Sequence, residues 1–247
     1  MEKKRVIVTG GGASGLMAAI AAAENGAAVT ILEQNEKPGK KICATGNGKC
    51  NFTNIQVPSD AYRSENPGFE QAVLNQFSVE DTVKFFTRLG IYPVNKNGGG
   101  QAASVAEVLC MEARNLGVKI KTNQKVQRVF KEQDIWKVQV EGWIYEGEAV
   151  ILANGSKASA ISGSDGSGYE LAAALGHRLI EPLPALTALK CRNTGFSGWA
   201  GVRTEGRITL LVDGEKVTEE TGELQLTDYG VSGIPVFQVS RYGIRAL

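Results

Sequence analysis

Residues 5–33 read RVIVTGGGASGLMAAIAAAENGAAVTILE, and this stretch decides the fold. A short β-branched run over residues 5–9 predicts a buried strand, and the glycine-rich turn at 10–15 follows it at once. An Ala-rich segment over residues 16–25 predicts a helix, and residues 28–32 predict a second strand that ends at an acid. The order strand, G-x-G-x-x-G, helix, strand and acid is typical of the first unit of a dinucleotide-binding domain.

The glycines and the acid of this motif have separate physical roles. Gly10 permits the sharp turn, Gly12 lets a diphosphate approach the backbone, and Gly15 lets the helix pack closely on the sheet. Unpaired N–H groups at the helix N-terminus favour an anion. Glu33 can accept hydrogen bonds from both hydroxyls of an adenosine ribose and would repel a 2′-phosphate, which disfavours NADP. A glycine-rich turn in an unrelated α/β protein is the weaker interpretation.

Composition limits the class of protein. The 247 residues suffice for one large domain or two smaller ones, and 27 Lys and Arg nearly balance 26 Asp and Glu. We therefore expect no nucleic-acid partner. No apolar run reaches the roughly 18 residues of a membrane span, and no signal-peptide cleavage pattern is seen. With four cysteines outside any zinc spacing and one histidine, we expect no metal site and a reduced, cytoplasmic protein.

The middle of the chain alternates predicted helices with one long loop. Residues 34–59 predict a loop whose composition suits either a wrapped polar ligand or a solvated connector. Helices are predicted over residues 69–76, 79–89 and 104–117, with Ser78 as an N-cap. The apolar faces of the first two are expected to lie in the core, namely Val73, Leu74, Phe77, Val83, Phe86 and Leu89.

Strands and glycine-rich turns follow. A strand at 118–122 and an antiparallel meander over 125–131, 135–141 and 144–148 are predicted. A buried strand at 149–152 would end in a turn over 153–155, beside the ligand of the first glycine-rich turn, because ligands of open α/β sheets lie at the carboxyl ends of strands. Residues 163–168 open a further helix, at 169–175. This turn either presents N–H groups to an anion or is an ordinary surface turn. When the segment is considered alone, the surface turn is the stronger interpretation.

Pro182-Leu-Pro184 marks a predicted boundary between two domains, residues 1–183 and 184–247. In the second we expect strands over 185–192 and 203–226 with a hairpin at Asp213-Gly214, then a loop at 227–233 and a helix at 234–247. We therefore predict an α/β fold in which a Rossmann-like domain carries a small β-meander and a partial β-rich domain follows.

The segment after Glu33 resembles a known family. Residues 39–54, GKKICATGNGKCNFTN, match the pattern G-[KR]-K-[IL]-x-x-[ST]-G-x-G-[KR]-C-N-x-T-N of bacterial NAD(P)/FAD-dependent oxidoreductases, a family that includes bile-acid 3-dehydro-4,6-reductases and aminoacetone oxidases. The resemblance covers nearly the whole chain and is most specific at K-C-N-x-T-N. It continues in QAASVAEVL at 101–109, VILANG at 150–155, SGSDGSGYEL at 162–171 and GELQLTDYGVSGIP at 222–235.

The resemblance implies an FAD-binding domain of the two-dinucleotide-binding type with an inserted, here incomplete, β-rich substrate domain. It implies non-covalent FAD, NAD(P)H as transient reductant, and hydride transfer through the flavin to an unsaturated or carbonyl-containing small organic substrate. The cofactor-binding residues that it implies are Gly10, Gly12, Ala13, Ser14, Gly15, Glu33, Gln34, Lys41, Thr45, Gly46, Asn51, Val126, Ala153, Asn154, Gly155, Asp165 and Gly166.

Candidates for the chemistry itself are few. Tyr229 is the candidate proton donor, because the resemblance places its loop near the flavin. His177 follows a glycine at a predicted helix end, where a capping role is the stronger interpretation. Cys43 and Cys50 are either redox-active or, as is commoner, unreactive thiols.

Three features depart from the family pattern. Family members are usually longer, and their last segment returns to the flavin-binding sheet, so we expect a missing C-terminal segment or a partner chain. The tyrosine-proline step is displaced to Tyr92-Pro93, and Asn154 stands where the family often has Thr, Ala or Gly. A flavin-binding protein without turnover therefore stays an alternative, and an NAD-dependent dehydrogenase is disfavoured by the segment after Glu33.

Overall fold

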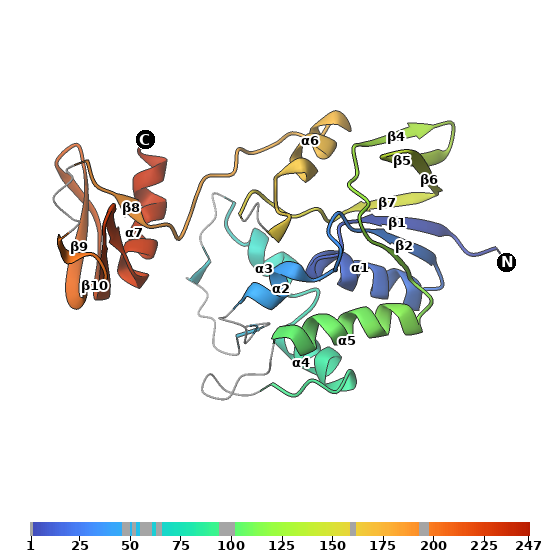
Figure 1. The fold of residues 1–247 in the computed structure, drawn as a ribbon, viewed down its shortest axis with the longest axis horizontal. Helices are drawn as coiled ribbons and strands as arrows, with labels where there is room; N and C mark the ends of the chain where they lie inside the picture. The colour runs from blue at the N-terminus through green and yellow to red at the C-terminus, as the bar shows by residue number, and fades with distance from the viewer. Residues whose placement is uncertain are drawn as a thin grey trace. The chain divides into compact units, whose positions relative to one another are not determined.

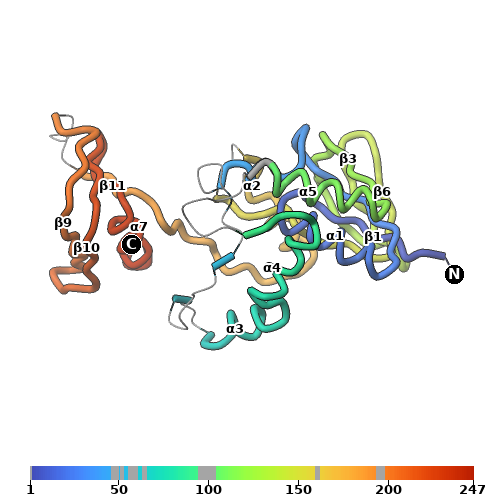
Figure 2. Tube along the Cα trace, turned by 90° about the horizontal axis from the view of Figure 1, so that it is seen from below, coloured from blue at the N-terminus to red at the C-terminus, as the bar shows by residue number. Residues whose placement is uncertain are grey.

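The computed structural model describes residues 2–45, 50, 53–54, 61–62, 66–93, 102–158, 162–192 and 198–247. Two compact units, Met1–Leu179 and Ile180–Leu247, make up the chain (Figures 1 and 2), and each is described by itself. The domain boundary expected after residue 183 stays a prediction.

A parallel sheet with the strand order β3-β2-β1-β7 forms the centre of the first unit. Its strands are β1 (Arg5–Thr9), β2 (Ala28–Leu32), β3 (Lys119–Lys121) and β7 (Ala149–Leu152). The central strand β1 pairs in parallel with β2 and with β7. Apolar residues dominate β1 because both of its faces are covered. The predicted α/β class and the order strand, turn, helix, strand are confirmed.

Helices cover one face of this sheet and a meander covers the other (Figure 1). Val6 and Val8 pack with residues of α1 (Ala13–Glu24), α4 (Val79–Arg88) and α5 (Ala102–Asn115). Ile7, which points the opposite way, packs with the meander β4 (Arg128–Glu132), β5 (Ile135–Val140), β6 (Trp143–Gly147) and with α6 (Ser167–Ala174). The period of two along β1 thus divides the core into two layers.

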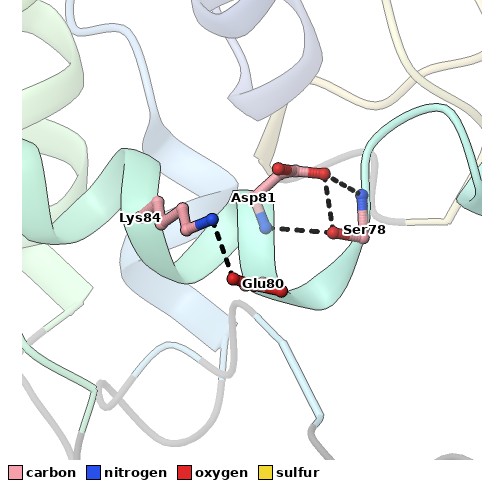
Figure 3. A network of polar contacts seen from close by, with 4 residues as sticks. All are labelled: Ser78, Glu80, Asp81 and Lys84. Carbon is pink, nitrogen blue, oxygen red and sulfur yellow. Dashed lines mark hydrogen bonds and ion pairs between the residues drawn. The ribbon is translucent and has the colours of Figure 1, made fainter.

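A capping box starts α4 (Figure 3). The Asp81 N–H donates to Ser78 Oγ at 3.1 Å, and the Ser78 N–H donates to Asp81 Oδ2 at 2.9 Å. One turn on, Lys84 Nζ lies 2.7 Å from Glu80 Oε1. The predicted N-cap at Ser78 is confirmed, and the box satisfies two backbone donors at the helix start.

Two predictions in this region were wrong. The expected loop at 34–59 contains a short helix, α2 (Lys40–Ala44). The helix α3 (Phe69–Leu74) has no buried residue, and Val73 and Phe77 are 51% and 47% exposed instead of lying in the core. A six-residue helix covers little surface, whereas the longer α4 does bury Phe86.

The second unit is an antiparallel sheet with the order β8-β11-β10-β9. Its elements are β8 (Leu189–Lys190), β9 (Arg203–Val212), β10 (Glu215–Thr227), β11 (Gly230–Ser232) and α7 (Ile234–Arg245). The predicted hairpin is confirmed, because Val212 pairs with Glu215 across Asp213-Gly214. The helix α7 begins with Pro235 in its first turn and buries Val236 and Val239 completely.

Two further predictions needed correction. The strand expected over 185–192 shrinks to two residues, and the loop expected over 227–233 contains β11. A two-residue turn lets Thr227 pair with Gly230, so the chain returns as a strand. Gly230 also allows β11 to pair closely with β8, because a side chain there would overlap the Leu189 carbonyl oxygen. None of the helices in the described ranges combines the length and the apolar character that crossing a membrane requires.

Candidate functional site

A pocket of about 1060 Å³ lies at the carboxyl ends of β1, β2 and β7 in the first unit. This volume lies just above the range of roughly 300–1,000 Å³ found for ligand sites, which suits a ligand as large as a dinucleotide. The predicted cofactor-binding residues that line it are Gly10, Gly12, Ala13, Ser14, Glu33, Gln34, Lys41, Thr45, Val126, Ala153, Asn154 and Gly155.

The three glycines of the first turn differ in what surrounds them. Gly10 has φ +95°, and a Cβ on it would lie 2.5 Å from the Ala153 carbonyl oxygen. A Cβ on Gly15 would overlap the Gly10 carbonyl oxygen. A Cβ on Gly12 would meet no atom of the described residues within 4 Å. The protein's own packing therefore requires glycine at positions 10 and 15, whereas position 12 is open for a ligand to approach.

The electrostatics of the turn favour an anion. No side chain caps the N-terminus of α1 at Gly12, and no acid lies in its first turn. Lys41 lines the same pocket, and no ion pair of Lys41 is found within the described part of the chain. A helix N-terminus with free N–H donors and a nearby cation is suited to a diphosphate.

Glu33 is a buried carboxylate, 6% exposed, held by three N–H donors. Its Oε2 accepts from the Gly11 N–H at 2.6 Å. Its Oε1 accepts from the Asn35 N–H at 2.8 Å and from Asn35 Nδ2 at 2.6 Å. A carboxylate has about four acceptor sites, so one remains, on Oε2. The geometry thus offers a partner to one ribose hydroxyl rather than to the two that the sequence suggests.

The turn after β7 adjoins the first glycine-rich turn, as predicted. The Ala153 N–H donates to the Thr9 carbonyl oxygen at 2.8 Å, and Thr9 Oγ1 donates to Asn154 Oδ1 at 2.6 Å. The glycine-rich turn near Gly163 also belongs to the pocket wall, and Gln34 Nε2 donates to the Gly163 carbonyl oxygen. Its place in the pocket wall favours the interpretation in which the turn faces a ligand, and contact with an anion stays a prediction.

Asp165 and Gly166 do not line this pocket. Asp165 accepts from the Ser167 N–H at 3.0 Å and pairs with Lys125 Nζ at 3.0 Å. The hydrogen bond from Ser167, helped by Lys125, lowers the pKa of Asp165 to about 2. Gly166 has φ +85° beside Lys157. Both residues shape the start of α6, and their predicted cofactor contacts stay predictions.

The remaining predicted site residues divide by position. Gly46 and Asn51 lie outside the described residues. Tyr229 lies at the two-residue turn between β10 and β11 of the second unit, and its catalytic role stays a prediction. The His177 N–H donates to the Ala172 carbonyl oxygen beside Gly176 at φ +87°, which supports the capping interpretation. Cys43 is exposed and Cys50 is half-buried.

Sequence reasoning missed an apolar wall of the pocket. Helices α1 to α5 and the turn between α3 and α4 supply this wall, with side chains that the periodic pattern either assigns to the core or leaves without a role. Its members are Met17, Ile42, Val73, Phe77, Phe86, Val105 and Leu109. The pattern of apolar residues predicts which face of a helix is buried. It does not show whether other parts of the protein or a ligand bury that face.

Comparison with known proteins supports the resemblance. The family profile "HI0933-like protein Rossmann domain" matches residues 4–240. The chain is 45% identical to the 3-dehydro-bile acid delta(4,6)-reductase of Clostridium scindens, over 98% of this chain and 61% of that protein. It is 30% identical to the ribosomal RNA dihydrouridine synthase of Haemophilus influenzae, over 96% and 61%.

The chain thus spans about three fifths of the length of these relatives. Among solved structures, CtdE in complex with FAD matches with a TM-score of 0.37 and 20% identity, over 64% of this chain and 40% of that one.

Proposed function

The chain belongs to the HI0933-like Rossmann-domain family, and we propose from this premise that it is an FAD-dependent oxidoreductase. The observation that carries the proposal is the open position at Gly12, beside the buried Glu33 and the uncapped start of α1. A dinucleotide explains why a glycine stands where the protein's own atoms leave room for a side chain.

Residues at the strand ends would hold non-covalent FAD. The turn Gly12–Ser14 and the N–H groups of α1 would bind the diphosphate, and Oε2 of Glu33 would accept from a ribose hydroxyl. Lys41 would balance phosphate charge, and Val126 would border the adenosine end. When bound, FAD supplies hydride-transfer chemistry with NAD(P)H as the transient reductant. The chain's own residues bind and orient the cofactor and keep water from it.

The substrate that we propose is a small organic molecule with a carbonyl group or a conjugated double bond. The relative from Clostridium scindens is named a reductase of such a molecule. Tyr229, whose side chain is exposed, would donate the proton that accompanies hydride addition to the substrate.

Ribosomal RNA is the second candidate substrate, because the relative from Haemophilus influenzae is named for it. The charges of the second unit favour the small molecule. On the β9–β10 ribbon, Arg203 lies 3.0 Å from an oxygen of Glu223, and Arg207 and Lys216 lie within 3.6 Å of the two oxygens of Glu219. Paired cations do not form the basic stripe that contacts a phosphate backbone.

Three measurements test the proposal in order. Purified protein should show a flavin absorbance spectrum and release FAD on denaturation, and a colourless protein that FAD does not reconstitute would refute it. Anaerobic NADH or NADPH should then bleach the flavin. A yellow protein that neither nicotinamide bleaches would be the flavin-binding protein without turnover. Reoxidation by a 3-oxo-4,6-unsaturated bile acid, compared with ribosomal RNA, decides between the substrates.

A further inference from the structure

Thr9 is a polar residue at an unexpected place, the last position of the central strand β1. It is fully buried and lies in register between Leu32 of β2 and Leu152 of β7. A buried hydroxyl must find a partner. Thr9 finds it at the pocket wall, in the side chain of Asn154.

The geometry of this contact identifies the donor. Thr9 Oγ1 lies 2.6 Å from Asn154 Oδ1 and 3.4 Å from the Ile151 carbonyl oxygen. A separation of 2.6 Å lies within the range of O–H···O bonds and below that of N–H···O bonds. The single hydroxyl proton therefore goes to the nearer oxygen, and the Asn154 amide is held with Oδ1 toward Thr9.

The other end of the Asn154 amide carries the Nδ2 group, which has two N–H donors. Asn154 lines the pocket, and no hydrogen bond of its Nδ2 group is found among the described residues. The backbone of Asn154 adjoins Gly10, since a Cβ on Gly10 would lie 3.1 Å from Asn154 Cα. Two N–H donors are thus available next to the turn proposed for the diphosphate.

We propose that Thr9 is a positioning residue whose hydroxyl orients the Asn154 amide, so that Nδ2 donates to the diphosphate of the bound dinucleotide. With the amide reversed, Oδ1 would face the phosphate oxygens and repel them. The inference rests on the proposed function, because it needs a dinucleotide in this pocket. It assigns a role in ligand affinity to a buried residue that does not itself touch the ligand.

The test measures dissociation constants for ADP and for FAD in the full chain. Thr9→Val should weaken both about tenfold, the effect of losing a hydrogen bond to a charged group, and Thr9→Ser should restore affinity. Asn154→Ala should weaken both similarly, and Thr9→Val should then add nothing to it. Thr30→Val, a matched change in β2, should leave both constants unaltered. Thermal melting without ligand verifies that each variant folds.

Asn154→Asp tests the same inference if Thr9→Val fails to fold. The aspartate keeps an acceptor for the Thr9 hydroxyl and presents a negatively charged oxygen to the diphosphate. It should bind ADP at least tenfold more weakly. Unchanged ADP binding by Thr9→Val or Asn154→Asp overturns the inference. So does a Thr9→Val effect that persists in Asn154→Ala, or a loss for FAD without a loss for ADP. If the wild type binds neither ligand, the proposed function falls too.

Discussion

Replacing Gly12 by alanine should separate the stability of the fold from binding of the cofactor. The added Cβ would meet no atom within 4 Å in the part of the chain that the structure describes, and φ at Gly12 is −76°, a value open to any residue. A compatible Gly→Ala change stabilises by about 0.4–1 kcal/mol through the unfolded chain. Alanine is a poorer N-cap than glycine by an amount of similar size. The free energy of unfolding should therefore change by less than about 1 kcal/mol.

Binding of FAD should respond quite differently to Gly12→Ala. The methyl group would stand between the backbone and the diphosphate, and each lost hydrogen bond to a charged group costs about 1.5–3 kcal/mol. One lost bond already weakens binding at least about tenfold. The assay combines urea denaturation without cofactor with titration of FAD by flavin fluorescence.

The matched control is Gly198→Ala in the second unit. A Cβ on Gly198 would also meet no atom of the described residues within 4 Å, so this variant should change the free energy of unfolding by less than about 1 kcal/mol and leave the affinity for FAD unaltered. Wild-type affinity for FAD in Gly12→Ala would refute the diphosphate assignment. A large loss of stability in the same variant would refute the argument that position 12 serves the ligand and not the fold.

Three further changes probe the framework around the pocket. Gly15→Ala should lower the free energy of unfolding by about 3 kcal/mol or more in urea denaturation, because the Cβ overlaps the Gly10 carbonyl oxygen. Ser78→Ala should lower it by about 1 kcal/mol through the lost cap of α4, with the affinity for FAD unaltered. Asp165, with its pKa lowered to about 2 from the model-peptide value of 3.8, should stabilise the fold above pH 3.8 and lose that effect as the pH falls toward 2. Solvent screening limits the effect to about 1 kcal/mol, and Asp165→Asn should reduce the pH dependence of melting over this interval by that amount.

The first β1-α1-β2 unit was predictable because its signals are local. Strand, turn and helix each follow from residues within a few positions of one another, and the glycines mark the change of direction. The hairpin at Asp213-Gly214 and the N-cap at Ser78 were predictable for the same reason. In each case the residue type alone suits the local backbone conformation or provides the hydrogen bond that the backbone needs there.

The errors arise where a distant partner decides. Val73 and Phe77 have the spacing of a core face, yet α3 is too short to bury them. The strand β11 forms because Gly230 allows close pairing with residues far along the chain, and β8 keeps only the two residues that reach it. Thr9 carries no motif of its own, and its contact with Asn154 spans 145 positions. Local patterns contain no information on such pairings.

Glu33 shows how the pocket can be ready for a ligand before one arrives. No ion pair of Glu33 is found in the described part of the chain, so N–H donors hold its charge. One of these donors belongs to Gly11, inside the glycine-rich turn, and the Gly11 carbonyl oxygen accepts from the Gly39 N–H at the start of α2. The acid that would meet the ribose therefore also fixes the turn that would meet the diphosphate. Binding then requires little ordering of either group, and a site organised in advance loses less affinity to conformational entropy.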